Sequence, residues 1–66
     1  MIIYHNADEI KKAFEKGIKI YSDNDNYIVV KDRLNQYLIE CTINNYCIGL
    51  TWQDNKTLNG KLFYSK

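Results

Sequence analysis

The stretch QYLIECTINNYCIGLTW, residues 36–52, contains two runs of apolar, β-branched and aromatic residues joined by Asn44 and Asn45. Such runs favour strands, and a two-residue asparagine turn is typical of a β-hairpin because asparagine tolerates a positive φ. The stretch therefore predicts a hairpin in which Ile43 lies opposite Tyr46. A sheet built on such a hairpin is antiparallel.

The same register places the two cysteines on opposite faces of the hairpin. Cys41 lies opposite Ile48, and Cys47 lies opposite Thr42, so the alternation of side chains separates the two thiols. The thiols are therefore not expected to form a disulfide or to bind one metal ion, and His5 is the only histidine that could add a ligand. We expect Cys41 to be a core residue, Cys47 to be partly exposed, and the protein to have no metal site. The face of Cys41 also carries Tyr37, Ile39, Ile43, Tyr46 and Ile48, and we expect the helix to cover it.

The length and charge of the chain restrict the function. Sixty-six residues make a single domain, residues 1–66, with a thin margin of stability. Nine basic and eight acidic residues give a net charge of +1, and a dedicated nucleic-acid binder usually has a marked basic excess. Nucleic acid is therefore a partner that the composition does not favour.

The N-terminal segment argues against export and against a membrane. Its first apolar run, MII, is far too short for a signal peptide or a membrane span. We expect a cytoplasmic protein with reduced thiols and no membrane partner, located in the host cytoplasm if a phage encodes it.

Residues 7–16 are predicted to form a helix. Asn6 precedes them as the N-cap, and Glu9 completes the spacing of a capping box. Gly17 supplies a left-handed stop. The helix has one apolar stripe, which consists of Ile10, Ala13 and Phe14.

After the helix, the pattern changes to strands. They are expected at residues 18–22, 27–31, 36–43, 46–52 and 61–65, with residues 2–4 as a candidate edge strand. Connections this short force antiparallel neighbours. We expect an α+β fold, with one N-terminal helix packed on a curled, meandering antiparallel sheet of four to five strands. A small, strongly curled β-barrel closed by the helix is the alternative.

The chain lacks the motifs that catalysis requires, so we expect a non-enzyme without a cofactor. His5 has no serine or cysteine near it in a nucleophile pattern. The predicted turn SDNDN, residues 22–26, resembles the start of a calcium loop, but the loop lacks the required glycine at its sixth place and has Leu34 where the glutamate belongs. The three glycines are isolated and form no phosphate loop.

Aromatic residues are the unusual feature, with six tyrosines and one tryptophan. Exposed Tyr and Trp are enriched in binding hot spots, although small sheets also place Tyr on a solvent-facing side without any binding role. The loop of residues 51–61, TWQDNKTLNGK, is the best single recognition segment. The candidate partner-binding residues are Tyr21, Asp23, Asp25, Tyr27, Asp32, Trp52, Asp54 and Lys56.

The order of these segments resembles a group of small uncharacterised phage and prophage proteins. The resemblance is carried by Gly17-Ile18-Lys19-Ile20-Tyr21, residues 27–32, Gln36-Tyr37-Leu38-Ile39, Ile48-Gly49-Leu50-Thr51 and Leu58-Asn59-Gly60. It implies a mobile-element origin and a role in binding and blocking a host machine, as anti-CRISPR-like inhibitors do.

Three hypotheses of function follow. The first is a protein-binding module, for example an inhibitor of a host defence complex such as a CRISPR effector. It would act by steric occlusion, and Asp23, Asp25 and Asp32 would mimic the phosphates of a nucleic acid. The second is a single-strand nucleic-acid binder. The bases of the bound strand would stack on Tyr21, Tyr27 and Tyr37, and its phosphates would lie along Lys19, Lys31 and Arg33. The third is a homodimer that pairs through an edge strand, residues 27–30 or 61–65.

Overall fold

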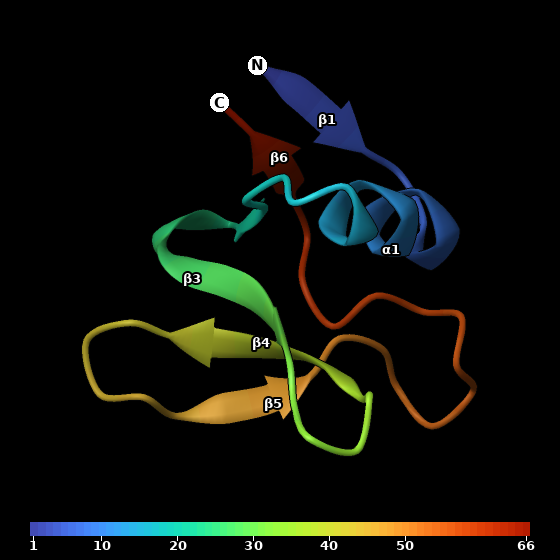
Figure 1. The fold of residues 1–66 in the computed structure, drawn as a ribbon, viewed down its shortest axis with the longest axis vertical. Helices are drawn as coiled ribbons and strands as arrows, with labels where there is room; N and C mark the ends of the chain where they lie inside the picture. The colour runs from blue at the N-terminus through green and yellow to red at the C-terminus, as the bar shows by residue number, and fades with distance from the viewer.

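The computed structural model describes residues 1–66 as one helix and a six-stranded sheet (Figure 1). The elements in chain order are β1 (Ile2–Tyr4), α1 (Ala7–Glu15), β2 (Tyr21–Ser22), β3 (Asn24–Lys31), β4 (Tyr37–Cys41), β5 (Cys47–Gly49) and β6 (Phe63–Ser65). The strand order is β1-β6-β2-β3-β4-β5, and every neighbouring pair is antiparallel. The α+β prediction agrees with this architecture, and the edge strand expected at residues 2–4 is present.

The predicted strand number, order and curvature need correction. The sheet has six strands rather than four or five, and it is not strongly curled. It is also not a simple meander, because the C-terminal strand β6 lies between β1 and β2. Tyr64 pairs with Ile3 on one side and with Tyr21 on the other. Since β1 and β5 remain unpaired edges, the sheet is open and does not close into a barrel.

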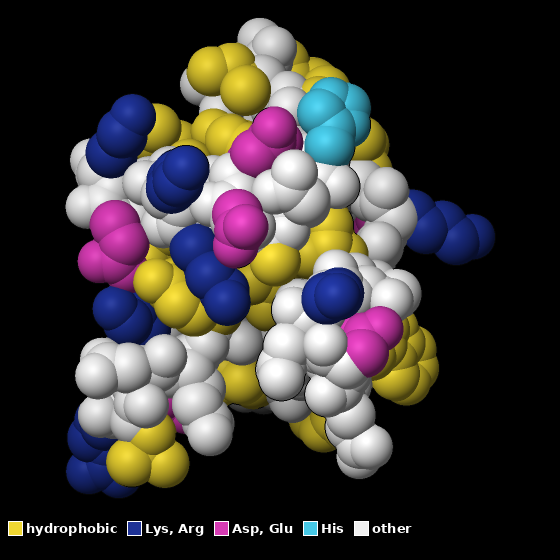
Figure 2. Space-filling model, turned by 90° about the vertical axis from the view of Figure 1, so that its right-hand side faces the viewer, with side chains coloured by type: hydrophobic (Ala, Val, Ile, Leu, Met, Phe, Trp, Pro, Cys, Tyr) yellow, Lys and Arg dark blue, Asp and Glu magenta, His cyan; other side chains and the backbone are white.

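The helix forms as the capping pattern predicts. The Asn6 side chain accepts a hydrogen bond from the Glu9 N–H at 2.9 Å, and the Glu9 carboxylate accepts one from the His5 N–H at 2.8 Å. The helix ends at Glu15, and Gly17 has the left-handed φ of 86°. On the side of the molecule formed by α1, Figure 2 shows acidic and basic side chains interspersed with hydrophobic ones.

The predicted two-residue turn of the β4–β5 hairpin is wrong. Ile48 pairs with Ile39 rather than with Cys41, because residues 42–45 form a longer loop. A two-residue type I′ turn needs a positive φ at both central positions, and in this loop only Asn45 has one, at 62°. The shift of two residues preserves the faces of both strands. Cys41 is therefore buried and Cys47 exposed, and both are free thiols.

The predicted turn at residues 22–26 is reduced to a sharp bend at Asp23, whose φ is 67°. Ser22 pairs directly with Asn24, whereas Tyr21 pairs with Ile28, so a bulge lies in the first half of β3. The Asp23 carboxylate accepts hydrogen bonds from the backbone N–H groups of residues 61 and 62, both at 2.9 Å. The bend therefore also fixes the entry into β6.

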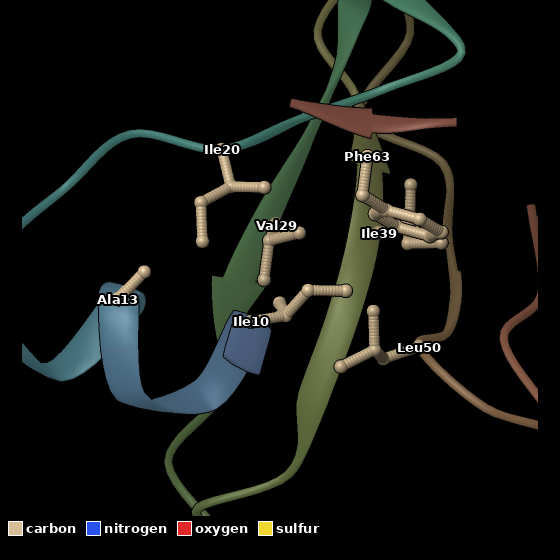
Figure 3. Packing of buried hydrophobic residues seen from close by; sticks show 7 residues of the cluster. All are labelled: Ile10, Ala13, Ile20, Val29, Ile39, Leu50 and Phe63. Carbon is tan, nitrogen blue, oxygen red and sulfur yellow. The ribbon is translucent and has the colours of Figure 1, made fainter. Parts of the chain in front are cut away.

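The core lies between α1 and one face of the sheet, which we call the helix-side face (Figure 3). Ile10 and Ala13 point from the helix toward side chains of the sheet and of the segments beside it. The complete cluster consists of Ile10, Ala13, Ile20, Val29, Ile39, Leu50 and Phe63. Because no helix covers the other face, which we call the outer face, the burial of apolar surface depends on this single layer.

Replacement of Ile10 tests this core. Its side chain has no exposed surface, so Ile10→Ala should lower the free energy of unfolding by about 2–5 kcal/mol through the lost burial and the cavity left behind. Ile18→Ala is the matched control, because Ile18 is 37% exposed and its truncation should cost less than about 1 kcal/mol. Urea denaturation of both variants measures the difference. Equal losses would contradict the packing described above.

Candidate protein-interaction surface

The helix covers only part of the helix-side face. Figure 1 shows α1 at one side of the sheet and the β4–β5 loop at the opposite side. Near this loop, Tyr27 pairs with Cys41, and the Tyr46 carbonyl accepts a hydrogen bond from the Cys41 N–H at 2.8 Å. Tyr27, Cys41 and Tyr46 therefore form a row across β3, β4 and the residue that precedes β5. Ile48, opposite Ile39, begins the next row.

Four large apolar side chains remain exposed at this end of the molecule. We call them the hairpin patch: Tyr27, Ile43, Tyr46 and Ile48, with exposed fractions of 39%, 74%, 69% and 37%. Tyr27, Tyr46 and Ile48 share the helix-side face by their register, and Ile43 lies in the loop beside them. Neither of the two ion pairs of the protein involves a member of the patch.

Polar side chains fixed by hydrogen bonds lie beside the patch. The backbone N–H and the hydroxyl of Thr42 both donate to the Asn26 carbonyl, at 2.7 and 3.1 Å. The Asn44 side chain accepts from the Tyr46 N–H at 3.0 Å. An apolar, aromatic centre within a polar rim is the usual anatomy of a protein interface, and a fixed loop loses little entropy on binding.

The outer face of the sheet carries a second aromatic group. The rings of Tyr21 and Tyr64 stack with centroids 5.4 Å apart, and the ammonium groups of Lys19 and Lys66 lie 5.6 and 4.9 Å from the Tyr21 ring centroid. The Tyr64 hydroxyl donates to the Asp25 carboxylate, which also accepts from Lys66 at 2.6 Å. These contacts attach the C-terminal strand to β3.

The ionisation of this cluster follows from its hydrogen bonds. Lys66 and then Tyr64 donate to Asp25 and lower the pKa of its carboxyl group. The Asp25 carboxylate in turn raises the pKa of Tyr64 to about 12. The phenol therefore stays protonated as a donor through the physiological range, which suits a structural attachment rather than proton transfer.

A similar arrangement joins the helix to the sheet. The Tyr37 hydroxyl and the Lys31 ammonium both donate to the same oxygen of Glu15, at 2.6 and 2.9 Å. The Tyr37 ring makes an edge contact with Phe14, and the Lys11 ammonium lies 5.3 Å from its centroid. The Tyr37 ring is therefore packed against the helix, and the residue is half-buried.

Three of the predicted binding aspartates accept hydrogen bonds from the backbone of bends and loops. Asp23 accepts from the backbone of residues 61 and 62, and Asp32 accepts from the N–H groups of residues 34 and 36 at 2.8 and 2.9 Å. Asp54 accepts from the N–H groups of residues 56 and 57 and from the Thr57 hydroxyl, and these bonds lower its pKa. Asp32 lies beyond the end of β3, away from the bend at Asp23, so Asp23, Asp25 and Asp32 do not form a phosphate-like row.

The remaining predicted residues fall into separate groups. Tyr21 and Asp25 join the outer-face cluster, and Tyr27 belongs to the hairpin patch. Trp52 is 60% exposed and shares the loop of residues 51–61 with Asp54 and the exposed Lys56. That loop follows Leu50, whose N–H donates to the Tyr37 carbonyl, at the end of β4 opposite to Tyr27. The structure thus separates Trp52 from Tyr27.

The tyrosines of the nucleic-acid hypothesis share no common surface. Tyr21 lies on the outer face, whereas Tyr27 and Tyr37 lie on the helix-side face. Phe14 and two lysine ammonium groups lie against the Tyr37 ring. A row of bases needs adjacent exposed rings, and this arrangement offers none for these three residues.

The homodimer hypothesis named strands that are internal to the sheet. Residues 27–30 lie in β3, between β2 and β4, and residues 63–65 form β6, between β1 and β2. Their backbone groups are already paired on both sides, so neither strand is an edge. The free edges are β1 and β5.

Sequence reasoning missed Ile43, Tyr46 and Ile48 as surface residues, because their face was assigned to the helix. The helix has nine residues and is about 13 Å long at 1.5 Å per residue, whereas the molecule extends 27 Å along its two longest axes. The short length of the predicted helix was therefore the one signal in the sequence that part of this face would stay exposed. Tyr64 and Lys66 were missed because only the inserted position of β6 brings them to Asp25.

A groove of about 340 Å³ lies beside Tyr37 on the helix side of the β3–β4 turn. Its polar lining includes Lys11, Gln36 and Thr51. These groups offer hydrogen bonds but no nucleophile paired with a base.

Comparisons with protein-family models, with curated proteins and with solved structures find no match to this chain. The structure contains no helix with the length and apolar character that crossing a bilayer requires. It also contains no group of three or more His, Cys, Asp or Glu side chains arranged to hold a metal ion.

Titration of Tyr64 tests the outer-face cluster. Asp25→Asn removes the carboxylate that holds the phenol protonated, so the pKa of Tyr64 should fall from about 12 toward its ordinary value of 10.0. In the unaltered protein, the stabilisation from this bond is complete below pH 10 and is lost as the pH rises toward 12. Nuclear magnetic resonance of ring-labelled tyrosine follows the titration of each residue.

Asp54→Asn is the control for that titration, because Asp54 binds only groups of its own loop. It should leave the pKa of Tyr64 unchanged. An equal fall in both variants, or no fall in Asp25→Asn, would contradict the assigned cause.

Proposed function

We propose that this protein is a binding module that recognises another protein through the hairpin patch. The observation that carries the proposal is the exposure of four large apolar side chains at the end of the sheet that the helix does not cover. Two of them, Tyr27 and Tyr46, are aromatic, and tyrosine is among the residues most enriched in hot spots.

The patch leaves apolar surface in contact with water. Binding a partner over the patch would remove apolar surface from water, and this term drives most protein association.

The narrower form of the proposal is an inhibitor encoded by a phage or prophage, which acts on a host defence complex such as a CRISPR effector. Its support is the resemblance to small phage proteins together with a surface suited to binding. The mechanism would be steric occlusion, because a patch of apolar side chains at a fixed hairpin can cover a partner's working surface without any reaction.

Truncation of the patch tests the proposal. Tyr27→Ala and Tyr46→Ala should each reduce affinity by about 30-fold or more, since truncation of a hot-spot residue costs about 2 kcal/mol or more. The tagged protein is used to capture partners from a lysate of its host cells, in nuclease-treated and untreated halves. A protein retained in both halves, and lost with each variant, is the expected result.

Two controls define the surface. Leu34→Ala removes a side chain that is 77% exposed in the β3–β4 turn, and Trp52→Ala removes one that is 60% exposed in the separate loop. Both variants should retain the partner. Retention by Tyr27→Ala and Tyr46→Ala, or retention that disappears with nuclease, would overturn the proposal.

A further inference from the structure

The first strand, β1, is an apolar edge with one unused side. It pairs only with β6, so half of its backbone hydrogen-bonding groups face away from the sheet. Met1, Ile2 and Ile3 are 84%, 58% and 40% exposed. Figure 2 shows uncovered hydrophobic side chains at the top of the molecule, at the height where β1 lies in Figure 1. Such an edge is a template for another strand.

An open groove of about 360 Å³ lies between β1 and α1. Ile2 and Tyr4 are on the helix-side face of β1, because they pair with Ser65 and the buried Phe63. The groove is lined by Ile2, Ile3, Tyr4, Glu9, Lys12, Ala13, Lys16 and Ile18. A groove between an edge strand and a helix is a common site for peptides that add a strand, because pockets for alternate side chains then lie beside backbone hydrogen bonds.

The net charge on the rim of the groove is positive, because two lysines lie beside one glutamate. Lys12 and Lys16 belong to neither of the two ion pairs, which join Lys31 to Glu15 and Lys66 to Asp25. Glu9, the one acidic residue of the lining, accepts the His5 N–H as part of the helix cap. A ligand that supplies carboxylates would therefore complement this rim.

We propose that this groove binds an extended, acidic segment of a partner protein, which pairs with β1 as a seventh strand. One apolar side chain of the segment enters the groove beside Ile2 and Ala13, and a carboxylate lies near Lys12 or Lys16. The site is distinct from the hairpin patch, since β1 and β5 are opposite edges of the sheet. A second copy of the chain is a poorer occupant, because it would bring the same two lysines to both sides of the joint.

The test uses a library of random linear peptides displayed against the purified protein. Enriched peptides should alternate apolar residues with polar ones and carry at least one Asp or Glu. The most enriched peptide, made synthetically, should shift the amide resonances of residues 2–4. The double variant Lys12→Glu, Lys16→Glu should weaken its binding by about tenfold, and Lys12→Arg, Lys16→Arg should preserve it.

The hairpin variant Tyr46→Ala should bind this peptide normally, which separates this site from the proposed function. Circular dichroism confirms that each variant is folded. The proposal is overturned if no peptide is enriched, if the enriched peptides lack acidic residues, or if the charge reversal leaves affinity unchanged. Concentration-dependent self-association abolished by Ile3→Lys would assign the edge to a second copy instead, and would also overturn it.

Discussion

The insertion of β6 between β1 and β2 is the constraint on which the rest of the structure depends. β6 has only three residues, yet all three are buried, and Phe63 joins the core while Tyr64 stacks on Tyr21. The Asp23 bend holds the entry to this strand, and Asp25 and Tyr4 bond to its side chains. Without β6, β1 would have no partner, and the groove beside the helix would not exist.

The second constraint is the length of the helix. One helix of nine residues covers one side of the helix-side face and no part of the outer face. At the side nearer the helix, Glu15, Tyr37 and Lys31 fix the contact with the sheet. At the other side, Tyr27 and Tyr46 stay exposed, although Cys41 between them is buried. The division of the helix-side face into a core and an exposed part therefore follows from where the helix stops.

Local patterns predicted local structure well. Asn6, Glu9 and Gly17 specified the helix, because a cap and a left-handed stop depend only on neighbouring residues. Alternation also placed Cys41 and Cys47 on the correct faces, although the loop between them was predicted too short. The loop is longer than two residues because Asn45 has a positive φ and Asn44 does not. The sequence does not show this difference, because asparagine occurs both with a positive φ and in αR or β conformations.

Features that depend on distant residues were not predictable in the same way. The position of β6 rests on pairings between Tyr21 and Tyr64 and between Ile3 and Tyr64, which no local pattern reveals. The candidate binding residues were chosen by type. Most of the aspartates among them proved to hold bends, while the exposed surface came from apolar hairpin residues assigned to the core. Exposure depends on what packs above a residue, and here that was decided by the reach of the helix.

The pairing of Ile2 with Ser65 also has a consequence for synthesis on the ribosome. The meander from β2 to β5 uses contacts between residues close in the chain, and such contacts form early because they close short loops. β1 reaches the sheet only through β6, so it stays without a partner until residues 63–65 have left the exit tunnel. During that interval the most apolar strand of the protein is exposed, and the groove beside it has not yet formed.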